Sequence, residues 1–263
     1  MNQSERRQYL IRALLAEQPR YNGMEIPPDA MGQKLLLRSL FNVREPGEAD
    51  GSFLAVQDEY LREEIRQKGV TRLSDLSPIE PGIFLWRGDI TTLAADAIVN
   101  AANSGMTGCY QPCHTCIDNC IHTFAGIQLR NFCAKIMAEQ GHPEPTGTAK
   151  ITPGYNLPCR YVIHTVGPIV RGRLTGTQEN QLASCYRACL SVARGNGCES
   201  IAFCCISTGV FGFPKERAAE IVVQTVRDFL KQTSNGMKVI FNVFGEEDEQ
   251  IYRRLLGKNG TAA

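Results

Sequence analysis

The chain has 263 residues, which is enough for one domain with an extension or for two small domains. Hydrophobic residues make up 43% and charged residues 21%, as in ordinary globular proteins, and a formal net charge of +1 argues against nucleic acid as the main partner. The sequence contains no apolar run that could span a membrane, and its eleven cysteines follow no secretory signal. We therefore expect a cytoplasmic protein with reduced thiols and no membrane partner.

The first part of the chain has the apolar spacing of helices. Apolar side chains recur three and four residues apart in three segments, which are separated by Pro- and Gly-containing breaks at residues 26–28 and 45–47. The apolar positions are Tyr9, Leu10, Ala13, Leu14, Leu36, Leu37, Leu40, Phe41, Phe53, Leu54, Tyr60, Leu61 and Ile65. We expect residues 1–78 to form a helical N-terminal extension, with a linker over residues 77–82.

Beyond Gly82, short β-rich runs alternate with longer helical patterns. Strands are predicted at residues 83–86, 97–99, 149–152, 161–164, 201–204 and 239–243, and helices at 117–139, 178–194, 215–231 and 248–256. This alternation favours an α/β fold over residues 79–263, with helices on both faces of the sheet. Ligands of such sheets bind at the carboxyl ends of strands, so the loops there are the first places to look for a site.

Two short motifs follow predicted strands. Asp89 lies in a turn, where its carboxylate either accepts a hydrogen bond from an exocyclic amine such as adenine N6 or caps the next helix. Taken alone, this motif favours the cap. The run Asn100-Ala101-Ala102-Asn103 combines small residues with amides that suit ribose hydroxyls, although Asn after a strand is also common turn chemistry.

The stretch from Cys109 to Asp118 is the most informative part of the chain. It holds three thiols and one imidazole, the ligands that zinc prefers, close enough for one loop to surround one ion. Cys109 and Cys116 could be joined by Cys113 or by His114; these two are adjacent and tend to project in different directions. Three protein ligands leave one position for water or a substrate oxygen, which is typical of catalytic zinc. The alternative is a run of reduced thiols without metal, and we favour one Zn²⁺ per chain.

Residues 207–214 connect a predicted strand to a predicted helix and contain Gly209 and Gly212. Glycines let backbone N–H groups approach phosphate oxygens, and the start of a helix adds a favourable dipole. The segment lacks the Lys-Ser/Thr ending of a P-loop. Strand–helix turns also carry glycines for conformational reasons alone, so this segment is a weak signal in isolation.

Together and in this order, the segments resemble the macrodomain family, whose members bind ADP-ribose. The matching segments are residues 88–90, 96–103, 117–122, 145–149, 161–168 and 207–214. The resemblance implies a three-layer α/β/α fold with a central mixed sheet. Among macrodomains, the chain is most similar to the MacroD-type hydrolases. Its Cys-rich insertion and helical extension resemble a zinc-dependent microbial subgroup found beside sirtuin-type ADP-ribosyltransferases.

The resemblance also implies roles for individual residues. Asp89 and the backbone of Ile90 would bind the adenine amine, and Phe244 would pack against the ring. The diphosphate would be held by Ser207, Thr208, Gly209, Val210 and Phe211. Asn103 and Asp118 would face the distal ribose as catalytic residues, and the zinc ligands would be Cys109, His114 and Cys116.

Some of these residues have simpler interpretations. Asp118 is the candidate base for hydrolysis; its simpler interpretation is a helix cap, and the resemblance favours the catalytic role. Asn119 stands where macrodomains usually have glycine, so the path of the preceding loop does not follow from the resemblance. His122 and His164 lie in apolar patterns and are expected to be packed, hydrogen-bonded histidines.

The function implied by the resemblance is a zinc-dependent hydrolase that removes mono-ADP-ribose from modified protein side chains. Its partners would be ADP-ribose and mono-ADP-ribosylated protein. The alternatives are a non-catalytic ADP-ribose reader, which needs neither the metal nor Asp118, and an O-acetyl-ADP-ribose deacetylase, which would use the same site.

Overall fold

The computed structural model describes residues 1–233 and 236–257. The first elements are α1 (Gln3–Ala16), η1 (Pro19–Tyr21), α2 (Ala30–Val43), α3 (Gly51–Lys68), β1 (Thr71–Arg72), η2 (Leu73–Asp75), β2 (Pro78–Glu80), β3 (Ile83–Arg87), η3 (Ile90–Thr92), β4 (Leu93–Ala94) and β5 (Ala97–Ala101). The later elements are α4 (Ile117–Ala125), α5 (Ile127–Gln140), β6 (Ala149–Pro153), β7 (Tyr161–Thr165), α6 (Gly176–Gly195), β8 (Ser200–Phe203), α7 (Lys215–Thr233), β9 (Lys238–Val243) and α8 (Glu246–Gly257).

Helices α1, α2 and α3 form an N-terminal extension with its own apolar core, as the spacing of apolar residues predicts. Each helix begins at a capping side chain: Asn2, Asp29 and Asp50 accept hydrogen bonds from backbone N–H groups of the first turn. The buried residues of this core are Leu10, Ile11, Leu14, Leu37, Leu40, Phe41, Phe53, Tyr60, Leu61 and Ile127. Because Ile127 belongs to α5, the extension shares its core with the rest of the protein.

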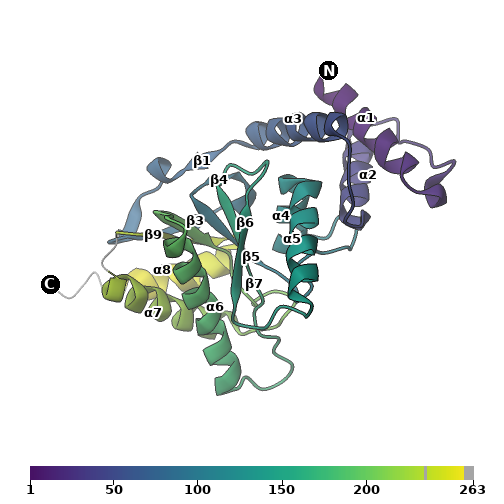
Figure 1. Ribbon diagram of the computed structural model, residues 1–263. Coiled ribbons are helices and arrows are strands. Elements are labelled where there is room, and N and C mark those ends of the chain that lie inside the picture. Colours follow the sequence, from purple (N-terminus) through teal and green to yellow (C-terminus); the bar gives the residue numbers. More distant parts are fainter. Residues whose placement is uncertain (234–235, 258–263) are drawn as a thin grey trace.

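The remaining chain is a three-layer α/β/α sandwich around a mixed sheet. In the described residues the strand order of this sheet is β2-β3-β9-β8-β5-β7-β6. The inner strands are parallel, and β2 and β6 pair antiparallel at the two edges. Helices α4 and α5 cover one face, and α6, α7 and α8 cover the other (Figure 1). Residues 97–99 and 239–241 are completely or almost completely buried, as expected for strands covered on both faces.

The helix predicted over residues 117–139 is two helices, which meet at Gly126. This glycine has φ +96°, a conformation that side chains other than glycine rarely adopt. A Cβ atom here would lie 2.7 Å from Gln57 Nε2, and Gln57 Oε1 accepts a hydrogen bond from the N–H of Ile127. A side chain of the extension thus occupies the space where the helix would otherwise continue.

Three short strands have no counterpart in the sequence prediction. Residues 77–82, expected as a linker, contain β2, which pairs with β3; β1 and β4 form a separate parallel pair. Each of these strands has only two or three residues, too few for an alternating pattern to show.

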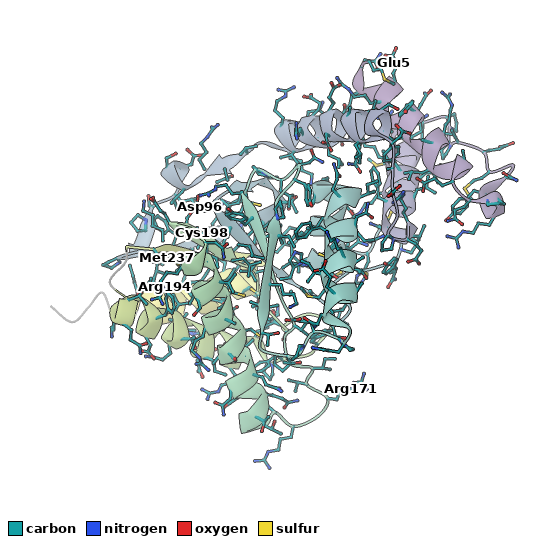
Figure 2. All side chains as sticks on the ribbon, viewed as in Figure 1. Glu5, Asp96, Arg171, Arg194, Cys198 and Met237 are labelled. Carbon is teal, nitrogen blue, oxygen red and sulfur yellow. The ribbon has the colours of Figure 1, made fainter. Side chains whose placement is uncertain are left out.

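Asp96 lies at the amino end of β5 and ties this strand to β8 (Figure 2). Its Oδ2 accepts hydrogen bonds from the N–H groups of Glu199 and Ser200 and from the Ser200 hydroxyl. Asn103 lies beyond the other end of the same strand, so Asp96 supports the sheet at the edge away from Asn103.

Among the helices in the described ranges, none has both the length and the apolar character needed to cross a membrane.

Candidate active site

The residues assigned to ligand binding follow the carboxyl ends of parallel strands. Asp89 follows β3, Phe244 follows β9, residues 207–211 follow β8, and Asn103 with the Cys-rich loop follows β5. These strands are consecutive neighbours in the sheet, so all four segments meet at one edge. Across the sheet, the segments expected at adenine come first, the segment expected at the diphosphate follows, and the segment expected at the distal ribose comes last.

Asp89 is held in place from two sides. Its Oδ1 accepts hydrogen bonds from Thr91 N–H (3.0 Å) and Oγ1 (2.6 Å), so it caps η3, and its Oδ2 lies 2.9 Å from Lys68 Nζ. Burial opposes ionisation, but the hydrogen bonds from Thr91 and Lys68 outweigh it and hold the pKa of Asp89 below its ordinary value. The neighbouring Ile90 N–H has no acceptor within the described residues.

Phe244 follows β9, the strand next to β3 in the sheet, and is held less firmly than Asp89. The N–H of Gly88 donates to the carbonyl of Val243, so the chain segments that lead to Asp89 and Phe244 run side by side. The Phe244 side chain is 82% exposed. An aromatic ring with this exposure suits a planar apolar ligand such as adenine.

Residues 207–211 form a loop in which three successive N–H groups have no acceptor in the described chain. Ser207 has φ +66°, and its carbonyl accepts from Phe213 N–H, which fixes the turn. The N–H groups of Gly209, Val210 and Phe211 donate no hydrogen bond to any described residue. Successive unpaired N–H groups in a loop are the usual cradle for phosphate oxygens.

Asp118 is buried and held by two amides. It is 5% exposed, and its Oδ1 and Oδ2 accept hydrogen bonds from Asn100 Nδ2 (2.8 Å) and Asn103 Nδ2 (3.2 Å). Burial raises the pKa of Asp118 to about 6, although hydrogen bonds from both amides and the charge of Arg130 oppose the rise. Asp118 is not the cap of α4, since the Cys116 side chain occupies that position. The carboxylate is thus free of the capping role that the sequence left open.

Behind Asp118 lie the two buried histidines. Asn100 Nδ2 also donates to His164 Nδ1 (3.1 Å), so the proton of His164 is on Nε2, which contacts Thr152 Oγ1 (2.9 Å). Burial lowers the pKa of His164 to about 3 and holds that of His122 well below its ordinary value, so both rings are neutral. His164 is packed and hydrogen-bonded, as expected, whereas neither ring nitrogen of His122 has a hydrogen-bond partner in the described chain.

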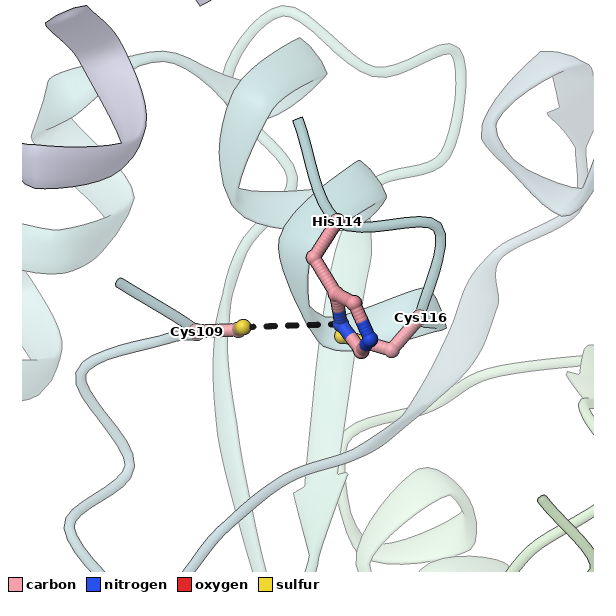
Figure 3. Close-up of side chains that lie close together, drawn as sticks. All are labelled: Cys109, His114 and Cys116. Atoms are coloured by element: carbon pink, nitrogen blue, oxygen red, sulfur yellow. Dashed lines mark hydrogen bonds between the residues drawn. The ribbon is translucent and has the colours of Figure 1, made fainter. Parts of the chain in front are cut away.

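Cys109, His114 and Cys116 converge, as Figure 3 shows. Their sulfur and nitrogen ligand atoms lie within 4.8 Å of one another, and Cys109 Sγ is 3.7 Å from His114 Nδ1. Zinc–sulfur and zinc–nitrogen bonds of about 2.3 and 2.0 Å in a tetrahedron place such atoms roughly 3.5–3.8 Å apart. The donor set and its spacing therefore fit one zinc ion with three protein ligands.

Cys116 would bind a metal ion as the thiolate. Burial raises the pKa of this thiol to about 12 against the hydrogen bond from Asn119 N–H, and the nearby Cys109 and Asp118 add to the rise. Metal binding at this position would therefore release the thiol proton and depend on pH.

Cys113 points away from this group. It has φ +52°, its thiol donates to the carbonyl of Leu35 (3.4 Å), and its sulfur lies 3.3 Å from Ser39 Oγ. Both of these partners belong to α2. Of the two ligand sets that the spacing allowed, the structure assembles the one containing His114.

The sequence patterns missed the residues that support this site from a distance. Lys68 at the end of α3 pairs with Asp89 across 21 positions, and Arg38 of α2 contacts the Cys-rich loop across 76 positions. Asn100 was noted only as part of a motif. No local signal marks such contacts, since they depend on how the extension packs.

Comparison with known proteins gives consistent results. The Macro domain family matches residues 99–222. A Treponema medium protein named protein-ADP-ribose hydrolase is 60% identical over 260 residues, covering 97% of this chain and all of that protein. A protein of the same name from Staphylococcus aureus strain MSSA476 is 49% identical over 257 residues, covering 97% of this chain and 96% of that protein. The solved structure of the Trypanosoma brucei macrodomain in complex with ADP-ribose superposes with a TM-score of 0.65 at 32% identity, covering 84% of this chain and 95% of that one.

Proposed function

This chain belongs to the Macro domain family, and from that membership together with the group of Cys109, His114 and Cys116 we propose that it is a zinc-dependent hydrolase that removes mono-ADP-ribose from modified proteins. The observation that supports this most directly is the order of groups along one edge of the sheet. The edge carries, in order, a carboxylate with an exposed ring, a loop of unpaired N–H groups, and a buried carboxylate with a metal-ligand group. This order matches adenine, diphosphate and distal ribose in ADP-ribose. Relatives that align with nearly the whole chain are named for this activity.

We place ADP-ribose along this edge. Asp89 accepts a hydrogen bond from the adenine amine, and the Ile90 N–H donates to the adenine ring. Phe244 packs against the face of this ring. The loop of residues 207–211 takes the diphosphate oxygens, with the unpaired N–H groups of Gly209, Val210 and Phe211 as the donors. The distal ribose then lies between Asn103 and Asp118, with the acceptor side chain of the modified protein beyond it.

Hydrolysis breaks the bond between the anomeric carbon of the distal ribose and the acceptor side chain. Water attacks that carbon, Asp118 accepts the proton of the water, and the leaving side chain takes up a proton as it departs. Asn100 and Asn103 hold the carboxylate in position for this transfer. A bound zinc ion supplies a Lewis acid that polarises a distal-ribose oxygen or acidifies a water molecule. Its ligands are Cys109, His114 and Cys116.

Three further proposals follow. All eleven cysteines are free thiols, which supports a reducing, cytoplasmic location. We also place the end of the helical extension at residue 78 and the macrodomain over residues 79–263. The group of Cys109, His114 and Cys116 supports our third proposal, that the protein is one of the zinc-dependent macrodomains found beside sirtuin-type ADP-ribosyltransferases.

The experiment compares three readouts on one preparation. The first readout is ADP-ribose binding, measured by calorimetry. The second is release of ADP-ribose from an automodified protein under single-turnover conditions. The third is deacetylation of O-acetyl-ADP-ribose. We expect wild type to release ADP-ribose from the modified protein and the Asp118→Ala variant to lose this release. Tight binding without turnover of either substrate would identify a reader, and turnover of the acetylated ligand alone would identify a deacetylase.

A further inference from the structure

Helix α2 of the extension reaches directly into the metal loop through Arg38. The Nη2 group of this arginine donates to the carbonyl of His114 (2.8 Å), to Asn119 Oδ1 (3.0 Å) and to Cys120 Sγ (3.5 Å). One guanidinium therefore contacts a metal-ligand residue and the first turns of the helix that follows the loop.

Asn119 extends this contact to the other side of the loop. It is completely buried, and its Nδ2 donates to the carbonyls of Cys109 (3.3 Å) and Gln111 (2.9 Å). Arg38 orients the same amide by occupying its oxygen. The Asn119 amide thus holds the limb of the loop that carries Cys109, and Arg38 links this amide to the carbonyl of His114.

Two more residues of α2 hold the tip of the loop. Asn42 Oδ1 accepts a hydrogen bond from Cys113 N–H (2.9 Å), and Ser39 Oγ contacts the Cys113 sulfur. These contacts keep the Cys113 thiol directed at α2 and away from the three metal-ligand atoms. The residue adjacent to His114 is therefore anchored in the extension.

Arg130 of α5 makes the reciprocal contact from the macrodomain. Its Nη1 donates to the carbonyls of Phe41, Asn42 and Arg44 at the end of α2, and its Nε donates to the carbonyl of Thr107 before the loop. Its guanidinium also lies 4.3 Å from the centroid of the Tyr110 ring. The end of α2 and the start of the loop are thus fixed to the same buried side chain.

We propose that α2 is part of the metal centre and that Arg38 is the positioning residue that holds His114 and, through Asn119, Cys109 in the geometry that binds the ion. This inference rests on the proposed zinc site. Residues 102–116 contain no helix or strand, so the chain must lose considerable freedom before three ligands converge. The contacts from α2 supply part of that order, and such supporting contacts typically change metal affinity by about 10- to 100-fold.

The test measures zinc affinity by competition with a chromogenic chelator, using metal-stripped full-length protein. We expect Arg38→Ala to weaken zinc binding about 10- to 100-fold and Arg38→Lys, which keeps the charge but not the fork of donors, to weaken it nearly as much. Arg12→Ala is the matched control, because Arg12 is exposed on α1 and its hydrogen bond within the described residues is to Gln8, far along the chain from the metal loop. The zinc affinity of this variant should stay within about twofold of wild type.

Cobalt substitution adds a spectroscopic readout. The thiolate charge-transfer band of Co²⁺ should shift or weaken in Arg38→Ala if Cys109 is displaced. Unfolding of the stripped variants and their ADP-ribose binding report whether the fold survives. If wild type binds no zinc, the proposed metal site itself is wrong. If wild type binds zinc and folded Arg38→Ala binds it equally well with the same cobalt spectrum, the site stands and the role of Arg38 is refuted.

Discussion

The two ends of the candidate site are built in different ways. At the adenine end, Asp89 is held by Thr91 two residues away and by Lys68 of α3, and Phe244 projects with 82% of its surface exposed. At the distal end, Asp118 is 5% exposed and the metal loop is anchored by an arginine 76 positions away. Because Asp89 and Phe244 follow other strands than Asp118 and the metal loop, substitutions at the adenine end should alter affinity alone. At the distal end they should alter metal binding and chemistry.

The largest effect should come from Asp118→Ala. Removing a positioned base typically lowers the rate of a proton-transfer step by about 10²- to 10⁴-fold. We expect a loss of this size in single-turnover release, with ADP-ribose affinity changed only a few-fold. Asp228→Ala, a change at an exposed carboxylate of α7, is the control. A rate within tenfold of wild type would remove Asp118 from the mechanism.

The next largest effect should be on bound zinc, and it should differ among the thiols of Cys109, Cys113 and Cys116. Cys109→Ser and Cys116→Ser should each lower the bound zinc well below one per chain, because each removes a ligand. Cys113→Ser should keep the full metal content, because this thiol faces α2. Elemental analysis after gel filtration measures the content. Equal loss in all three variants would mean that the loop binds metal differently.

Asp89→Ala should act on affinity alone. A hydrogen bond to a charged group contributes about 1.5–3 kcal/mol, so ADP-ribose binding should weaken by roughly 10- to 100-fold. The rate at saturating substrate should stay within about twofold of wild type, because Asp89 and Asp118 follow different strands, β3 and β5. Calorimetry and single-turnover rates separate the two quantities. A rate loss as large as the affinity loss would show that the two ends are coupled.

The smallest effect should come from Phe244→Ala. Aromatic packing contributes about 0.5–1.5 kcal/mol beyond area burial, which corresponds to a roughly 2- to 12-fold loss of ADP-ribose affinity. Phe132→Ala on α5 is the matched control, because this ring is also exposed. Unchanged affinity in Phe244→Ala would place the adenine elsewhere.

Much of the fold follows from sequence patterns. The apolar spacing around Leu10, Leu37 and Leu61 predicts α1, α2 and α3, and β-rich runs predict the inner strands that end at the site. Both signals are local and periodic, so a single sequence is enough to read them. The break at Gly126 is not readable in this way, since it depends on Gln57 from another helix.

The same distinction applies to the site. Cys109, His114 and Cys116 are marked by ligand chemistry at close spacing, and the structure brings their ligand atoms together. Nothing local marks Lys68 or Arg38, because each acts on a carboxylate or a carbonyl far along the chain. Ligand residues are thus visible in the sequence, while the residues that hold them in place require the packed structure.

The most direct test of the account is a zinc titration of stripped full-length protein, with release of ADP-ribose from automodified protein measured at saturating substrate. The account predicts that the release rate rises linearly and levels off at one zinc per chain, while ADP-ribose affinity changes only a few-fold. Full release by verified metal-free protein would contradict the proposed role of the metal at the distal end of the site.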